Sequence, residues 1–292
     1  MGKPKLKVSS TVLPFREKAE SVWKLERYQY PRDKNRDVVF FGMYHIGDFL
    51  SFIKHRGRKI IFWTGGDVLN LRRGYLFSDG KQEWLSKIFS WIPIYLLFRT
   101  AENYCENEVE RKELADLGIY SEIAQSFLED IDDFQPCFKT NDERRHVYLS
   151  VRQGQEKEYG QELVEEIASR VPDVVFHIYG GKLDVSEPFN MVVRDNIIYH
   201  GSVPQNIFNG DIRNYHCGLR CNEHDGFSEI TAKSILLGQY PISRIRYQMV
   251  DNYQTKDELI ALLKGLKNKT EPNISVRNYW RFKLNDLPFL KN

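Results

Sequence analysis

Short apolar runs alternate with amphipathic segments over the second half of the chain. The apolar runs are typical of strands, and they lie at residues 146–151, 174–179, 196–200, 216–220 and 240–243. The segments between them repeat apolar positions at the helical period, and they lie at residues 157–170, 228–238 and 255–267. Strands that alternate with helices in this way predict a doubly wound parallel sheet.

The first half shows the same alternation in a shorter form. Residues 37–43 and 59–64 predict buried strands, and residues 47–56 between them have the apolar face of a short helix. A strand, a helix and a second strand in this order favour parallel pairing. Residues 106–117 predict an amphipathic helix, and residues 119–125 predict a last strand. The first half is therefore also expected to form a parallel α/β domain.

A polar, charged stretch separates the two halves. We interpret residues 129–145 (EDIDDFQPCFKTNDERR) as an interdomain linker. Because 292 residues suffice for two domains of ordinary size, we predict one domain over residues 1–138 and another over residues 139–292. Open parallel sheets bind ligands beyond the carboxyl ends of their strands, so the expected site is a cleft between the two domains.

Residues 84–98 (WLSKIFSWIPIYLLF) allow two interpretations. Their aromatic side chains, together with Lys87 and Arg99, suit a segment that lies at a membrane surface. The same residues could instead form a core helix that breaks near Pro93 and is followed by a buried strand. The sequence leaves both interpretations open.

Composition limits the partners. The formal net charge is only +2, whereas a domain that binds nucleic acid is usually strongly basic, so no nucleic-acid partner is expected. The charge is uneven, because residues 1–36 hold ten Lys and Arg against four Asp and Glu, and residues 54–59 read KHRGRK. This basic charge fits either a solvated surface or attraction to an anionic acceptor or a membrane face.

The sequence predicts neither export nor membrane insertion. The N-terminus lacks the apolar region of a signal peptide, and no run of 18 apolar residues occurs. The four cysteines lack the spacing of a zinc site and are interpreted as reduced thiols. We expect a cytoplasmic protein, with peripheral membrane contact through its basic and aromatic N-terminal segments as an open alternative.

Two cations follow the first predicted strand of the second domain. Arg152 and Lys157 lie in the loop SVRQGQEKEYG, at the expected carboxyl end of the sheet. Arg offers a planar fork and Lys a mobile point charge, and together they can neutralise a diphosphate. The alternative is a solvated charge cluster, because Glu156 and Glu158 are adjacent.

The stretch HDGFSEITAKSILLGQYPI at residues 224–242 combines a carboxylate, a glycine and a helix start. Gly226 allows close approach of the backbone to a ligand, and Ser228 suits the N-cap of the following helix. The free amides and the dipole of that helix would attract an anion. Asp225 can accept hydrogen bonds from sugar hydroxyls, or it can be a simple turn residue.

These motifs resemble retaining glycosyltransferases of the GT-B fold, close to the family 4 type. The family signature places an acidic residue before Gly-Phe-Gly and a helix that ends near Gly-x-Pro, and residues 225–228 and 237–241 stand in those places. The family's Arg-x-x-x-x-Lys spacing is kept by Arg152 and Lys157, with Val151 in place of the usual Gly. Residues 60–69 (IIFWTGGDVL) are similar to a segment of the family's first domain.

The resemblance implies a reaction and a donor. Residues 139–292 would bind a UDP- or GDP-sugar, and a hydroxyl of a glycan, lipid-linked or protein-linked acceptor would enter from the side of residues 1–138. Arg152 and Lys157 would stabilise the leaving diphosphate, and Asp225 would hold the sugar hydroxyls. The rest of the donor would meet the backbone amides of Gly226, Phe227 and Ser228, and the segment from Gly201 through Val203 to Gln205. No metal is required on this reading.

The chain also departs from the family pattern. Lys233 stands eight residues after Asp225, where the family carries a Glu that binds ribose; Lys cannot accept a hydrogen bond. Either Glu229 takes over that role, or Lys233 forms a surface pair with Glu229 at helical spacing. His224 is expected to position the Asp225 loop.

The first domain is reduced as well. The usual opening strand with its glycine-rich loop is not evident in residues 1–36. The loop GMYHIGD could substitute for it, with Gly42 allowing close approach and His45 as the polar group that faces the donor. Gly66 and Asp67 are further candidates on the acceptor side. A nucleotide-sugar epimerase on the same fold, or a non-catalytic relative that binds a glycan or a partner, are the competing functions.

Overall fold

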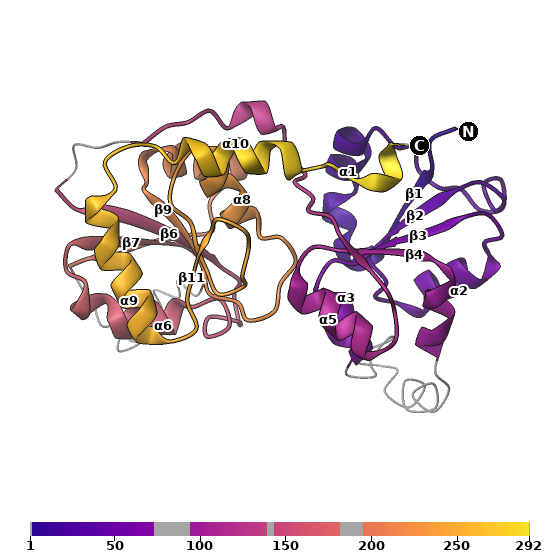
Figure 1. Cartoon of the computed structure of the whole chain (residues 1–292), viewed down its shortest axis with the longest axis horizontal. Helices are drawn as coiled ribbons and strands as arrows, with labels where there is room; N and C mark the ends of the chain where they lie inside the picture. The colour runs from indigo at the N-terminus through magenta and orange to yellow at the C-terminus, as the bar shows by residue number, and fades with distance from the viewer. Residues whose placement is uncertain (1, 73–93, 139–142, 182–194, 292) are drawn as a thin grey trace. The chain divides into compact units, whose positions relative to one another are not determined.

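The computed structural model describes residues 2–72, 94–138, 143–181 and 195–291, and the chain forms two compact units (Figure 1). Unit 1 contains Met1–Asp130, His224–Phe227 and Phe282–Asn292. Unit 2 contains Ile131–Glu223 and Ser228–Arg281. Short segments from late in the chain thus belong to unit 1. The expected boundary between residues 138 and 139 stays a prediction.

Unit 1 is built on a parallel sheet of five strands that follow chain order. The strands are β1 (Lys5–Val8), β2 (Val38–Phe41), β3 (Lys59–Phe62), β4 (Glu102–Cys105) and β5 (Glu122–Ile123). Both faces of this sheet are covered, which explains why β2 and β3 are almost continuous apolar runs.

One face of that sheet packs against α2 (Ile46–Lys54), α3 (Gly66–Arg72) and α5 (Glu108–Asp116). Phe52 of α2 lies with its ring centroid 5.2 Å from that of Phe98. The other face packs against α1 (Arg16–Trp23) and the C-terminal 3₁₀ helix η7 (Pro288–Leu290). Trp23 and Phe289 meet there edge to face, with ring centroids 5.9 Å apart. The last residues of the chain therefore complete the core of unit 1.

Unit 2 is built on a parallel sheet of six strands in the order β11-β10-β9-β6-β7-β8. The strands are β6 (Arg145–Val151), β7 (Val174–Gly180), β8 (Ile197–Gly201), β9 (Cys217–Arg220), β10 (Ile242–Ser243) and β11 (Asp251–Asn252). The chain starts at β6 in the middle, runs outward to β8, and returns to β9 on the other side of β6. Ligands bind at such a reversal in doubly wound sheets, beyond the carboxyl ends of the strands.

Helices cover both faces of the second sheet. α6 (Gln161–Ile167) and α9 (Lys256–Gly265) pack on one face, as Figure 1 shows. α7 (Gln205–Asp211) and α8 (Glu229–Leu236) pack on the other, where Ser234 Oγ accepts a hydrogen bond of 2.9 Å from Gly218 N. α10 (Ile274–Lys283) is held by Trp280, whose ring nitrogen donates to Gln248 O at 2.9 Å.

The first-domain predictions need three corrections. Strand β1 is present although none was expected in residues 1–36; Leu6 packs in the core, while Lys5 pairs with Glu26. The strand expected after Pro93 is instead a 3₁₀ helix, η2 (Ile94–Thr100), and the next strand begins at Glu102. Val109, an apolar residue that the amphipathic pattern of residues 106–117 would turn inward, is exposed on α5.

The structure tests only a small part of the two interpretations of residues 84–98. Residues 84–93 lie outside the described residues, and in the remainder Phe98 is buried in the core of unit 1. Among the described residues, no helix is both long enough and apolar enough to cross a membrane. Peripheral membrane contact stays a prediction.

Candidate functional site

The carboxyl ends of β1 to β4 lie at one edge of the unit 1 sheet, because these strands are parallel. Asp67, at the start of α3, is fully buried there. Its carboxylate accepts backbone hydrogen bonds from Met43 at 2.9 Å, Thr64 at 2.9 Å and Val68 at 3.0 Å. Burial raises the pKa of Asp67 to about 6. Asp67 thus joins the loop after β2 to the loop after β3, inside the protein.

The other acceptor-side candidates surround Tyr44. A Cβ at Gly42 would lie 3.0 Å from the Tyr44 ring, and one at Gly66 would lie 3.0 Å from its hydroxyl. His45 is partly buried, and its Nε2 lies 2.5 Å from the hydroxyl of Thr11. The structure therefore gathers Gly42, His45, Gly66 and Asp67 at one edge.

The turn from β4 into α5 and the start of that helix place three polar side chains at the same edge. Asn107 caps α5, because its Oδ1 accepts from Val109 N at 3.0 Å and Glu110 N at 3.1 Å. Glu106 precedes it and Glu113 lies one turn into the helix; both are buried. Glu106, Asn107 and Glu113 are called the corner below.

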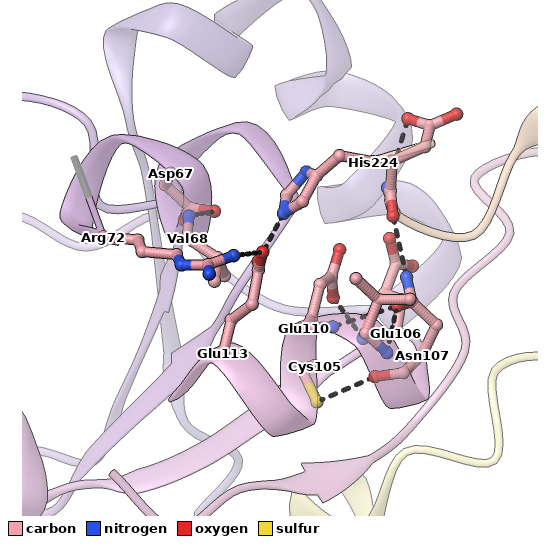
Figure 2. Close-up of polar contacts among 12 residues, drawn as sticks. Asp67, Val68, Arg72, Cys105, Glu106, Asn107, Glu110, Glu113 and His224 are labelled. Carbon is pink, nitrogen blue, oxygen red and sulfur yellow. Dashed lines mark hydrogen bonds and ion pairs between the residues drawn. The ribbon is translucent and has the colours of Figure 1, made fainter. Parts of the chain in front are cut away.

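The corner holds the segment His224–Phe227, which contains Asp225 (Figure 2). Glu106 Oε2 accepts from Phe227 N at 2.8 Å, and Asn107 Nδ2 donates to Asp225 O at 2.7 Å. The backbone of Asp225 is therefore fixed, whereas its side chain is only half-buried. His224 Nε2 lies 2.6 Å from a corner carboxylate, which places His224 as an anchor of the loop.

Two glycines allow this close packing. Gly65 has φ of +83°, and a Cβ there would lie 2.7 Å from Gly226 N. A Cβ at Gly226 would lie 2.2 Å from Glu106 Oε2. A side chain at either position would push the segment away from the corner.

Two of the three amides predicted to meet the donor already have acceptors in this structure. Phe227 N donates to Glu106, and Gly226 N donates to Asp225 Oδ1 at 3.1 Å. Ser228 occupies the N-cap position of α8, as predicted, but its side chain makes no capping hydrogen bond. An anion at this point would therefore rely on the amides of the first turn of α8.

Burial raises the pKa values of two neighbouring carboxyls. The pKa of Glu106 is raised to about 7, although Ser126 and Phe227 donate hydrogen bonds to it. The pKa of Glu110 is also raised well above its ordinary value, first by burial and then by the charge of Glu106, with Asp67 and Asp225 adding to it. Glu110 Oε1 is buried and has no hydrogen-bond partner among the residues that the structure describes, which favours the protonated form of Glu110.

We expect the free energy of unfolding to fall as the pH rises from about 4.5 to about 8. The folded state binds these protons more tightly than the unfolded chain, so their stabilisation is complete below the ordinary value of 4.5 and is lost as the pH passes about 7. Glu106 alone accounts for about 3 kcal/mol.

Denaturant titrations at several pH values test this expectation. Glu110→Gln should flatten the pH dependence, and Glu108→Gln, which changes an exposed glutamate of the same helix, should leave it as in the wild type. Equal slopes in the wild type and Glu110→Gln would contradict it.

In unit 2, the loop at residues 152–160 follows β6 at the carboxyl edge. Arg152 and Lys157 are both exposed there, and neither forms an ion pair with any residue in the described ranges. The neighbouring carboxylate of Glu156 accepts a hydrogen bond of 2.8 Å from Gly154 N. Two cations are thus presented to solvent beside the reversal of the sheet.

The loop after β6 touches the loop after β9. A Cβ at Gly160, whose φ is +90°, would lie 2.3 Å from Cys221 Sγ. Arg220 stacks on Tyr159, with its guanidinium 4.6 Å from the ring centroid. Gly201 ends β8 at the same edge, with Val203 half-buried two residues later. The candidates of unit 2 therefore share one edge of its sheet.

Lys233 is fully buried, which corrects the expectation of a surface pair. Its Nζ lies 2.5 Å from Glu229 Oε1 and 2.7 Å from Asn209 Oδ1, and 5.2 Å from the centroid of the Phe208 ring. The pair with Glu229 is present, and it ties the start of α8 to α7. The Glu229 side chain is 41% exposed, so Glu229 places a partly solvent-exposed carboxylate at the start of α8.

Sequence reasoning missed the corner. The sequence pattern predicts only an amphipathic helix over the segment that contains Glu106, Asn107, Glu110 and Glu113. Their position directly after a buried strand was the available signal, because such residues lie at the ligand-binding edge of a parallel sheet. Among the described residues, no group of three or more His, Cys, Asp and Glu side chains could hold a metal ion.

Known structures share this architecture. No protein-family model matches the chain, and no curated protein matches it in sequence. A TarM variant from S. aureus, solved with Fondaparinux, alpha-GlcNAc-glycerol and UDP, aligns with a TM-score of 0.59 at 14% identity over 88% of this chain. The chain spans 55% of TarM.

Two further structures cover more of the chain. The lipopolysaccharide outer core galactosyltransferase WaaB, in its apo form, aligns at a TM-score of 0.60 and 13% identity over 97% of this chain and 79% of its own. HepE from Anabaena, solved with UDP and glucose, aligns at 0.57 and 9% identity over 97% and 81%. The two parallel-sheet α/β domains thus have GT-B architecture, and identities this low show the fold alone.

Proposed function

We propose that this chain transfers a hexose from a UDP- or GDP-sugar to an acceptor hydroxyl, with retention of the anomeric configuration and without a metal. The observation that carries the proposal is the carboxyl edge of the unit 2 sheet. Arg152 and Lys157 are exposed there without an ion-pair partner among the described residues, next to the reversal of strand order. Such an edge suits a diphosphate.

The amides of the first turn of α8 add to this positive field. The side chain of the N-cap residue Ser228 makes no hydrogen bond to them, and they can donate hydrogen bonds to an anion. The solved neighbours TarM and HepE were both crystallised with UDP, which supports a nucleotide donor.

The proposed roles follow from position. Arg152 and Lys157 stabilise negative charge on the leaving diphosphate, and no Lewis acid is needed if these cations do so. Asp225, with its backbone fixed and its side chain half-buried, accepts hydrogen bonds from sugar hydroxyls. Glu229 contacts the ribose in place of the carboxylate that Lys233 replaces.

The remaining roles concern the base of the donor and the acceptor. Gly201 and Val203 line the base at the end of β8. The acceptor, whether a glycan or a lipid- or protein-linked group, meets the loops at the edge of unit 1. There Asp67 acts by fixing the loops that carry Gly42, His45 and Gly66, because its own carboxylate is fully occupied.

A panel of UDP- and GDP-sugars tests the proposed function. We expect slow release of nucleoside diphosphate from one donor without acceptor, because water can replace the acceptor hydroxyl, and faster release with a suitable acceptor. Sugar isomerised without loss of the nucleotide would identify an epimerase. Binding of a donor in calorimetry without any turnover would identify a non-catalytic relative, and either result would overturn the proposal.

A further inference from the structure

The three corner side chains also have hydrogen-bond partners outside the segment His224–Phe227. The second oxygen of Glu106 accepts from Ser126 N at 3.2 Å and from Ser126 Oγ at 2.7 Å. Asn107 Oδ1 is fixed by the first amides of α5, and Glu113 Oε1 accepts from Arg72 Nη1 at 2.6 Å. Each corner residue therefore uses one polar atom within the scaffold of unit 1 and another on the segment.

The corner holds the segment at its backbone and at its first side chain. It accepts the amide of Phe227, donates to the carbonyl of Asp225 and binds the imidazole of His224. None of these contacts uses the carboxylate of Asp225. The segment is thus held at three successive places, each of them outside the carboxylate of Asp225.

We propose that Glu106, Asn107 and Glu113 are positioning residues that fix Asp225 for the donor sugar. This inference rests on the proposed function, because the role of these contacts in the reaction depends on that function. The contacts themselves do not depend on it. To bind a sugar hydroxyl productively, the Asp225 carboxylate must lie within a few tenths of an ångström of its optimal position. Motion of the segment would therefore lower the rate of glycosyl transfer.

The sharpest variant is Asn107→Asp. An aspartate keeps the Oδ1 acceptor that caps α5, so the helix and the fold are retained. It loses the Nδ2 donor and places a carboxylate against the carbonyl of Asp225. The variant therefore releases the segment without removing the cap.

We expect amide hydrogen exchange over residues 224–227 to accelerate about 10-fold in Asn107→Asp, and kcat/KM for the donor to fall by about the same factor. Glu106→Gln, which keeps the shape of the side chain, should retain part of the activity that Glu106→Ala loses. Glu108→Gln is the matched control, because it removes an exposed carboxylate of the first turn of α5.

Two results would overturn the inference. Unchanged exchange in Asn107→Asp would show that the corner does not hold the segment. Accelerated exchange with kcat/KM equal to that of Glu108→Gln would show that the segment is held without any bearing on the reaction. Hydrogen exchange is measured without substrate, so it tests whether the corner holds the segment even if the wild type turns over no donor. Absence of turnover would overturn the proposed function and, with it, the role in catalysis that we assign to the corner.

Discussion

Replacing Arg152 by alanine is expected to lower kcat for glycosyl transfer by about 100- to 1,000-fold, the effect typical of removing one group that stabilises developing charge. Arg152 is exposed at the carboxyl edge of the unit 2 sheet and forms no ion pair with the residues that the structure describes. Its guanidinium can therefore turn to a ligand without breaking a contact in the protein. Charge grows on the diphosphate as the sugar leaves, so the interaction strengthens in the transition state and the loss falls mainly on kcat.

Steady-state kinetics of Arg152→Ala and Arg152→Lys measure this effect. Lysine keeps the charge but not the planar fork, so it should recover only part of the rate. Arg170→Ala is the control, because Arg170 is an exposed arginine of the same unit that pairs with Asp257 and precedes β7 at the opposite edge. If Arg152→Ala keeps the kcat of Arg170→Ala, the diphosphate does not bind where we place it.

The second unit could be predicted from sequence because its pattern is strong. Strands β6 and β7 are long and rich in apolar residues, and a glycine or a short polar loop follows each of them. The elements of the second unit that the sequence pattern does not predict are short or contain few typical strand-forming residues. Strand β11 has only two residues, Asp251 and Asn252, and neither is a typical strand former.

In the first unit, tertiary contacts override the local pattern. Strand β1 reads KLKV, and its two lysines argue against a buried strand. Lys5 is nevertheless buried, because its ammonium reaches Glu26 while Leu6 enters the core. Only a partner far along the chain makes this strand possible, and the local sequence does not show it.

The site could be predicted in part for the same reason. Arg152, Lys157 and Asp225 could be proposed as site residues from the sequence, because each follows a recognisable strand or precedes a recognisable helix. The corner could not be predicted, because Glu106 and Glu113 have the pattern of solvated residues of the helix predicted over residues 106–117. Only the contacts with Phe227 and His224 show that they are buried. Contacts between residues more than 100 positions apart leave no periodic signal.

Replacing Asp225 by alanine is expected to lower kcat/KM for the donor by roughly 10- to 150-fold, the range for loss of a hydrogen bond to a charged group. The contact from Asn107 to the backbone of Asp225 does not involve the side chain that is removed. The segment should therefore stay in place, and the loss should report on the sugar rather than on the fold. Asp225→Asn should fall between the wild type and Asp225→Ala, because its amide oxygen still accepts a hydrogen bond.

Deoxygenated donors separate this role from a general loss of structure. If Asp225 accepts from one sugar hydroxyl, a donor that lacks this hydroxyl already reacts slowly with the wild type, and Asp225→Ala should slow it no further. Glu223→Ala, two residues earlier, removes an exposed carboxylate that pairs with Arg244, and it should slow both donors equally or not at all. Should Asp225→Ala lower the rate of every deoxygenated donor by the same factor as that of the parent donor, the carboxylate acts on the structure of the loop and the sugar lies elsewhere.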